Sequence, residues 1–319
     1  MRSIPGSKGR KGREPMKWLA SLQVIALMAM SGVLWSWAQA EERPRSITLM
    51  TFQVGTLRSP RGEAEHAAFQ RKIRHLKEVI LRGEGGGIGA DVVGLQGVED
   101  LVATDALVVA MNRALGPERG SYVTWLLGEC GGEEGPRVAL LSKFPLAVFR
   151  NYFPTPSGPS MLHGVLDVHG VPLHVILNGW HRGPGDDAER MRRRQALWCR
   201  RLAETILKEA PHAPVVVMGD FQAPLDSLLM GFLERGASAH GPRLRPISSG
   251  ALVPWGERTS PSDMDHVFVS KALASDRPAG KGCAGGEKAY VRENSLMPGE
   301  HPPAWAECSM DAGSGQVLP

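Results

Sequence analysis

The stretch VVVMGDFQAP, residues 215–224, is the part of this sequence from which the fold is predicted most directly. Three valines and a methionine lie between Pro214 and Gly219, and an apolar run bounded in this way is typical of a short buried strand. Asp220 follows at the carboxyl end of that strand, where α/β proteins place catalytic side chains. A Gly-Asp pair after a strand is also an ordinary turn, so the role of Asp220 depends on what the rest of the chain brings to it.

Helices and further strands are predicted around this stretch. Two segments predict amphipathic helices. In residues 63–83 apolar residues recur three or four positions apart, at Phe69, Ile73, Leu76 and Ile80, and in residues 186–209 Met191, Trp198, Leu202 and Ile206 fall on one side of the helix. A shorter helix is predicted over residues 105–116. Apolar runs that end at turn residues predict strands over residues 45–55, 90–100, 121–130, 137–146, 160–170, 172–180 and 262–270. These strands come both in hairpins and in alternation with helices, which indicates mixed sheets covered by helices in one domain.

The first forty residues differ from the rest of the chain. Six basic residues precede an apolar stretch that ends in Ala38-Gln39-Ala40, a pattern typical of a secretory signal peptide. We expect cleavage after Ala40, a mature domain over residues 41–319, and a secreted or periplasmic protein with no integral membrane span after signal removal. Met16 is an alternative start, and an uncleaved anchor is the alternative to cleavage.

Removal of this segment changes the charge of the protein. The whole chain is formally +4, but residues 1–40 carry six basic residues and one acidic residue, which leaves 31 basic and 32 acidic residues. The mature balance therefore gives no strong nucleic-acid charge signature, although it allows a local basic cleft. The four cysteines share no metal-binding spacing, and export favours Cys283 with Cys308 as the first disulfide to test, with four thiols as the alternative.

Polar residues collect at the ends of the predicted strands. Each of them alone is more typical of a turn or a solvated strand end, but six groups in this order predict a site. They are Gln53, Gln96 with Glu99, Asn178, Asp220 with Gln222, Asp265 with His266, and Glu300 with His301.

In this order and context, the motifs resemble those of the endonuclease/exonuclease/phosphatase superfamily, the fold of apurinic endonucleases, pancreatic deoxyribonuclease, bacterial sphingomyelinases and inositol polyphosphate phosphatases. The resemblance covers residues 47–308 and rests on ITLMTFQVG, ADVVGLQGVED, VALLSKFPL, LNGWHRG, VVVMGDFQ, SDMDHVFVS and GEHPPAWAE. It implies an α+β fold, a four-layer α/β/β/α sandwich of two mixed β-sheets packed face to face and flanked by helices. The site is then expected at one end of the sandwich.

The resemblance also implies metal-assisted hydrolysis of a phosphoester, with Mg²⁺ or Mn²⁺ neutralising the phosphate charge. Asp220 falls at the position that orients or deprotonates the attacking water, and Gln222 falls at the amide that steadies the pentavalent state. His301 falls at the histidine that contacts the phosphate, and Asp265 at the aspartate that orients this histidine.

Several positions of the implied site are altered. The family's metal-binding Glu falls on Gly97, and the His of its NHW-type strand falls on Gly179. Two Asn positions are occupied by Gln53 and Gln222, and an Asp position by Glu300. The candidate metal ligands that remain are Glu300, Glu99 and Gln53.

These changes predict weak or absent hydrolase activity, that is, a pseudoenzyme. A displacement of about 1 Å can cost around a hundredfold in rate, and a lost metal ligand roughly a thousandfold. Glu99 could substitute for the missing carboxylate, because it lies two residues beyond Gly97 and would face the same side of a continuing strand, displaced by about 6–7 Å along it. His181 stands in the same relation to Gly179. The alternative is an active Mg²⁺-dependent phosphodiesterase or phosphatase, nuclease-like in type, that uses Asp220 and His301.

The substrate class stays open between a phosphorylated small molecule, a lipid and a nucleic acid. Mg²⁺ or Mn²⁺ is expected if the protein is active, and no cofactor otherwise. A run of arginines, residues 190–194, either contacts phosphate or forms the solvated face of a helix, and the acidic residues on the same helix favour the solvated face.

Overall fold

The computed structural model describes residues 45–82, 89–130, 136–155, 161–238, 241–247, 264–273 and 303–310. Residues 45–319 form one compact unit. Two of the candidate site residues, Glu300 and His301, lie outside the described residues, as do residues 1–40 and Cys283. Within the described part of the chain, no helix has both the length and the apolar character needed to cross a bilayer.

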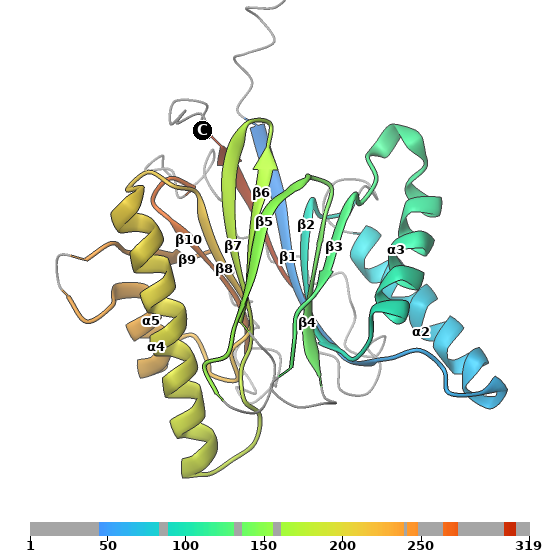
Figure 1. Cartoon of the computed structure of the whole chain (residues 1–319), viewed down its shortest axis with the longest axis horizontal. Coiled ribbons are helices and arrows are strands. Elements are labelled where there is room, and N and C mark those ends of the chain that lie inside the picture. The colour runs from blue at the N-terminus through green and yellow to red at the C-terminus, as the bar shows by residue number, and fades with distance from the viewer. Residues whose placement is uncertain are drawn as a thin grey trace, which may run out of the picture. The chain divides into compact units, whose positions relative to one another are not determined.

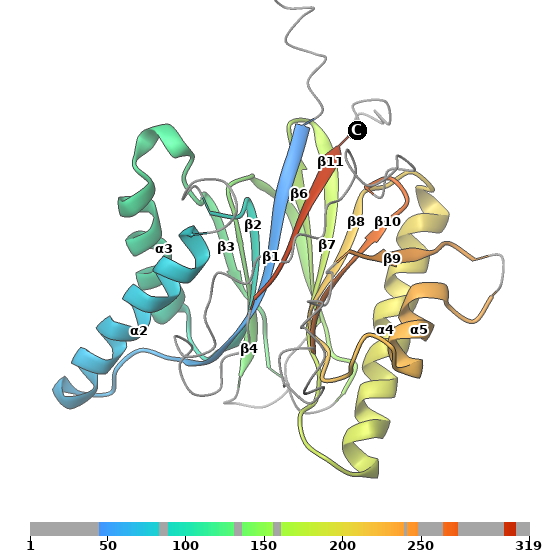
Figure 2. The ribbon, with the colours of Figure 1, turned by 180° about the vertical axis from the view of Figure 1, so that it is seen from behind.

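Two mixed β-sheets form the centre of this unit (Figure 1). The first has the strand order β11 (Ala304–Met310), β1 (Arg45–Leu57), β2 (Val92–Val98), β4 (Arg137–Ser142) and β3 (Thr124–Leu127). The second has the order β5 (Leu146–Tyr152), β6 (Met161–Val168), β7 (Val171–Gly179), β8 (Val215–Asp220), β10 (Asp265–Ser270) and β9 (Leu244–Pro246). Seen from behind, the last strand, β11, runs beside the first, β1 (Figure 2).

Helices cover the outer face of each sheet, which completes the four layers expected from the sequence. The helices α2 (Glu63–Leu81) and α3 (Leu101–Leu115) lie on the side of the first sheet, and α4 (Asp186–Glu209) and α5 (Leu228–Arg235) on the side of the second (Figure 1). A short 3₁₀ turn, Pro117–Arg119, follows α3.

Three apolar clusters hold the layers together, and the alternation of side chains along each strand explains them. On β8, Val216 and Met218 face the cluster between the two sheets, whereas Val215 and Val217 face the cluster under α4. A third cluster lies between the first sheet and its two helices. Because Asp220 continues the series of Val216 and Met218, its side chain belongs to the face between the sheets.

The alternation is interrupted at two glycines, Gly55 and Gly97. Leu95 and Val98 on β2 both join the helix-side cluster although they are three residues apart, and the same holds for Val54 and Leu57 on β1. The pairing register shifts at the same two places, and both glycines have positive φ, 65° at Gly55 and 90° at Gly97. Each strand therefore carries a glycine bulge at the end of the sandwich where the site lies.

Several local predictions hold and others are wrong. β6 and β7 form a hairpin, and His169 and Gly170 at its turn both have positive φ, as a type I′ turn requires. The α3 helix starts four residues earlier than predicted, since Asp100 caps its N-terminus. Trp198 is 43% exposed, so its assignment to the buried side of α4 is wrong. The strand β5 and the helix α5 were not predicted.

Candidate active site

Strand pairing brings the ends of β7, β8 and β10 together. β7 and β8 run parallel with Gly179 opposite Asp220, so their carboxyl ends meet at one edge. β10 runs antiparallel to β8, and its first residue, Asp265, lies opposite Asp220. From the facing sheet, Gln53 on β1 reaches across to Asp220 with a contact of 3.1 Å between Nε2 and Oδ2. The site therefore lies between the two sheets, at one end of the sandwich.

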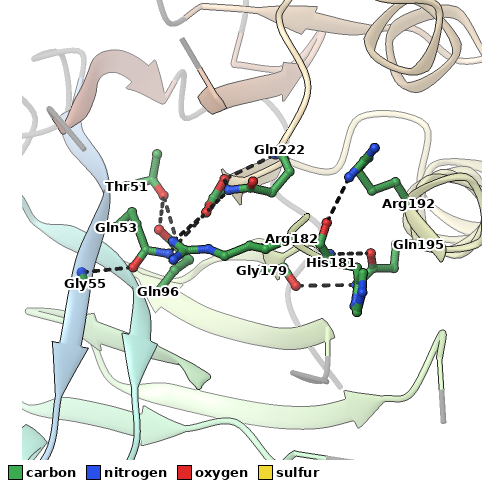
Figure 3. A network of polar contacts seen from close by, with 11 residues as sticks. Thr51, Gln53, Gly55, Gln96, Gly179, His181, Arg182, Arg192, Gln195 and Gln222 are labelled. Atoms are coloured by element: carbon green, nitrogen blue, oxygen red, sulfur yellow. Dashed lines mark hydrogen bonds and ion pairs between the residues drawn. The ribbon is translucent and has the colours of Figure 1, made fainter. Parts of the chain in front are cut away.

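The carboxylate of Asp220 is buried and accepts hydrogen bonds from three side chains. Gln222 donates through Nε2 at 2.7 Å to each carboxylate oxygen and through its backbone N–H at 3.2 Å to Oδ1. Arg182 donates from Nη2 to Oδ2 at 3.2 Å. Figure 3 shows the side chains of Gln53, Arg182 and Gln222 converging on one point. Every partner of this carboxylate among these contacts is an N–H donor.

The amide of Gln53 is held in a fixed orientation. Its Oε1 accepts a hydrogen bond from the backbone N–H of Gly55 at 3.1 Å, so Nε2 must face Asp220. Beneath it, Gln96 and Thr51 bond to each other, with Gln96 Nε2 3.0 Å from Thr51 Oγ1 (Figure 3). Gln96 thus supports the floor of the site and does not contact Asp220 in this network.

Gly97 leaves no room for a side chain. A Cβ atom at this position would lie 1.9 Å from the carbonyl oxygen of Gly55 and 2.5 Å from Oε1 of Gln53. Its φ of 90° is also one that residues with a side chain rarely adopt. The absence of a side chain at Gly97 thus allows the bulge at Gly55 and the amide of Gln53 to pack against it. A Gly97→Glu substitution cannot place a carboxylate here without a change in the backbone of β1.

Arg182 was not predicted as a site residue. It lies in the loop after β7 and enters the site only because β7 and β8 are parallel neighbours. The N-terminal half of α4 holds this loop in place. Arg192 Nη1 donates to the carbonyl oxygen of His181 at 3.3 Å, and Gln195 accepts from His181 N–H at 2.8 Å (Figure 3). Arg192 Nη1 also donates to the carbonyl oxygen of Gly183 at 3.0 Å.

The arginine run on α4 has mixed roles. Arg190 pairs with Asp187 and Arg193 with Glu189, both at the exposed surface, which agrees with the solvated face favoured by the sequence. Arg192 differs, because its side chain is only 13% exposed and it holds the loop that carries Arg182.

Other candidate residues are placed nearby or elsewhere. Asp265 is buried opposite Asp220, but His301, the residue that it was expected to orient, lies outside the described residues. His266 is buried, with Nε2 2.9 Å from the carbonyl oxygen of Ala223. Asn178 faces α4, where its Nδ2 donates to Ile176 and its Oδ1 accepts from Trp180, so it supports the fold and not the site.

The described residues do not fit a divalent cation at this site. Among residues 45–82, 89–130, 136–155, 161–238 and the shorter described segments, no three His, Cys, Asp or Glu side chains are grouped to hold a metal ion. Glu99 follows the bulge at Gly97, and its backbone N–H donates to the carbonyl oxygen of Leu57 at 2.8 Å. A carboxylate has about four lone-pair positions, and those of Asp220 are already met by N–H donors.

Solved structures of low sequence identity share this fold. The sphingomyelinase C of Streptomyces griseocarneus is 17% identical with a TM-score of 0.54, over 83% of this chain and 99% of that one. ANGEL2, a 2′,3′-cyclic phosphatase, is 15% identical with a TM-score of 0.58, over 83% and 96%. A truncated TDP2 of Caenorhabditis elegans is 12% identical with a TM-score of 0.51, over 83% and 97%. At these identities the likeness shows the fold alone.

The sequence itself identifies the family. We find no significant match among curated protein sequences. The model of the endonuclease/exonuclease/phosphatase family, in contrast, matches residues 57–286, which is more than half of the chain. This match agrees with the two mixed sheets, the flanking helices and the position of Asp220 at the end of β8. The chain therefore belongs to the endonuclease/exonuclease/phosphatase family.

Proposed function

We propose that this chain is an exported member of the family with a degenerate metal site and with weak or absent phosphoester hydrolase activity. Its ancestry is that of a metal-dependent phosphoesterase, and its retained site binds a phosphorylated ligand or serves as a scaffold. The export part of the proposal rests on residues 1–40, whose basic, apolar and Ala-x-Ala order is that of a signal peptide.

The observation that carries the proposal is the packing at Gly97. The family's metal-binding carboxylate is expected at this position, where a Cβ would lie 1.9 Å from the Gly55 carbonyl oxygen. The side chain is therefore not merely missing, because the backbone of β1 and the amide of Gln53 occupy its space. A site that had lost only the carboxylate would keep room for it.

The state of Asp220 supports the same proposal. A general base needs a lone pair that faces the water it deprotonates. In this chain Gln53, Gln222 and Arg182 direct four N–H groups at the two carboxylate oxygens, one of them shared between both. These donors take up the lone pairs of the carboxylate, which is therefore poorly placed to take a proton from water.

The ligand class that we propose is a phosphorylated small molecule or lipid. Structural neighbours include a sphingomyelinase C, named for a lipid, and a 2′,3′-cyclic phosphatase, named for a cyclic phosphate. The mature chain has nearly equal numbers of basic and acidic residues, and this balance argues against tight binding of nucleic acid through its phosphates.

Hydrolysis assays test the proposal. The purified protein is incubated with bis(p-nitrophenyl) phosphate and with p-nitrophenyl phosphate, in Mg²⁺, in Mn²⁺ and in excess chelator, beside Asp220→Ala. We expect the same low rate in all conditions and in the variant. Turnover that requires metal and is lost in Asp220→Ala would instead establish the active alternative, with Asp220 and His301 as catalytic residues and Glu300, Glu99 and Gln53 as the candidate ligands.

A further inference from the structure

Arg182 supplies the positive charge of this site. Its Nη2 lies 3.2 Å from Oδ2 of Asp220, and the two side chains differ sharply in exposure, 48% for Arg182 and 2% for Asp220. A buried carboxylate that lacks a compensating charge is strongly destabilising, so Asp220 needs a cation close by. Among the described residues, Arg182 is the one cation that forms an ion pair with Asp220.

We propose that Arg182 takes the place of the divalent cation, so that the site is a guanidinium–carboxylate centre that excludes metal ions. The inference rests on the proposed function and deepens it, because it states what replaced the metal. It also goes beyond loss of activity, since it predicts that removal of one arginine makes the site responsive to divalent cations.

The loop that carries Arg182 is held in position by α4. Arg192 bonds to the carbonyl oxygens on both sides of Arg182, those of His181 and Gly183. Gln195 bonds to the N–H of His181 and, at 3.4 Å, to the carbonyl oxygen of Gly179. Four hydrogen bonds from α4 thus fix the backbone that carries Arg182, so that pairing with Asp220 requires the ordering of its side chain alone.

The amides of Gln53 and Gln222 also donate hydrogen bonds to the carboxylate of Asp220. Nε2 of Gln53 is turned toward the carboxylate because Oε1 of the same amide accepts from Gly55. Nε2 of Gln222 contacts both carboxylate oxygens at 2.7 Å. Arg182 is the charged donor among these contacts, and a guanidinium has no lone pair to offer a metal ion. Exclusion of the cation therefore depends on Arg182, whereas the amide of Gln222 can turn its Oε1 toward a cation that takes the place of the guanidinium.

Thermal unfolding of the purified protein with and without millimolar Mn²⁺, at matched ionic strength, tests this inference. Mn²⁺ should not change the Tm of the native protein. Arg182→Ala should lower Tm by roughly 4–8 °C, because Asp220 loses its counter-charge. Mn²⁺ at about ten times its Kd should then return roughly 3–5 °C to this variant. Arg182→Lys keeps the charge and should behave as the native protein does.

Matched variants separate the charge from a general effect of substitution. Arg193→Ala removes another exposed arginine that pairs with a carboxylate, Glu189, and should show neither the loss nor the response to Mn²⁺. Arg182→Ala combined with Asp220→Asn should lose the response. If Arg182→Ala does not fold, Arg182→Gln keeps an N–H donor without the charge and is judged by the same response.

Two results would overturn the inference. One is an Arg182→Ala protein whose Tm Mn²⁺ leaves unchanged, and the other is a native protein that Mn²⁺ stabilises as much as it stabilises the variant. The hydrolysis assay separates this failure from failure of the proposed function. An inactive native protein with no Mn²⁺ response in the variant refutes only the role of Arg182, whereas metal-dependent turnover in the native protein refutes both.

Discussion

Substitution of Gly97 by alanine tests whether the backbone itself excludes a side chain at the position where the family resemblance places a metal-binding Glu. The added Cβ would lie 1.9 Å from the Gly55 carbonyl oxygen and 2.5 Å from Oε1 of Gln53. Residues with a side chain pay about 1–2 kcal/mol for a left-handed backbone, and overpacking against backbone atoms adds about 1–3 kcal/mol. We therefore expect Gly97→Ala to lower the free energy of unfolding by about 2–5 kcal/mol, measured by urea denaturation followed by circular dichroism.

Gly170 offers a matched control, because its φ is 87° against 90° at Gly97 and no atom lies within 4 Å of an added Cβ. Gly170→Ala should therefore show the backbone cost alone, about 1–2 kcal/mol. The difference between the two variants measures the steric exclusion at Gly97. Equal losses in both would refute the reasoning, because they would mean that the strand accommodates a side chain at this position.

Three further predictions concern the rest of the fold and the site. His163 is buried against His174, and burial, followed by the charges of His174 and Arg150, lowers its pKa to about 4 from 6.5. Below pH 7 the unfolded chain therefore binds a proton that the folded chain does not, so the free energy of unfolding is highest above pH 7 and falls as the pH drops toward 4. Urea denaturation should show a loss of about 2 kcal/mol between pH 7.5 and pH 5, and the His163→Leu variant should not show this loss. Arg200 is fully buried and donates to Glu204 at 2.8 Å and to the carbonyl oxygen of Leu233 at 2.9 Å, so Arg200→Ala should cost about 3–5 kcal/mol in the same assay. Arg192→Ala frees the loop of Arg182, and we expect amide hydrogen exchange in residues 181–183 to become faster while β8 stays protected.

Each of these has a result that would count against it. A pH dependence that persists unchanged in His163→Leu would assign it to other groups. A loss below about 1 kcal/mol in Arg200→Ala would mean that water replaces its partners. Unchanged exchange in Arg192→Ala would mean that Gln195 alone holds the loop.

The strands and the place of Asp220 were accessible from the sequence because burial imposes a pattern on it. Val215, Val216 and Val217 face two different apolar layers, so the strand has to be apolar on both sides and ends where the first charged residue appears. β5 was missed for the opposite reason. It is an edge strand whose central residues are exposed, and it therefore carries little of that pattern.

The partners of Asp220 could be predicted only in part. Gln53 and Gln222 were predicted as site residues from the motifs, and the structure places the amides of both against Asp220. Arg182 lies in a loop, and only the parallel pairing of β7 with β8 brings it to the carboxylate. The resemblance placed the family's metal-binding Glu on Gly97, which stays a prediction. The positive φ of Gly97 and its close contact with Gly55 depend on a bulge that the sequence pattern does not predict.

Titration of the native protein with Mn²⁺, followed by the electron paramagnetic resonance signal of the free ion, tests the central claim most directly. If the metal site is degenerate, the signal should match that of buffer up to millimolar Mn²⁺. Binding of one equivalent at submillimolar concentration, lost in Asp220→Ala, would contradict the account and show that a metal site persists at the end of β8.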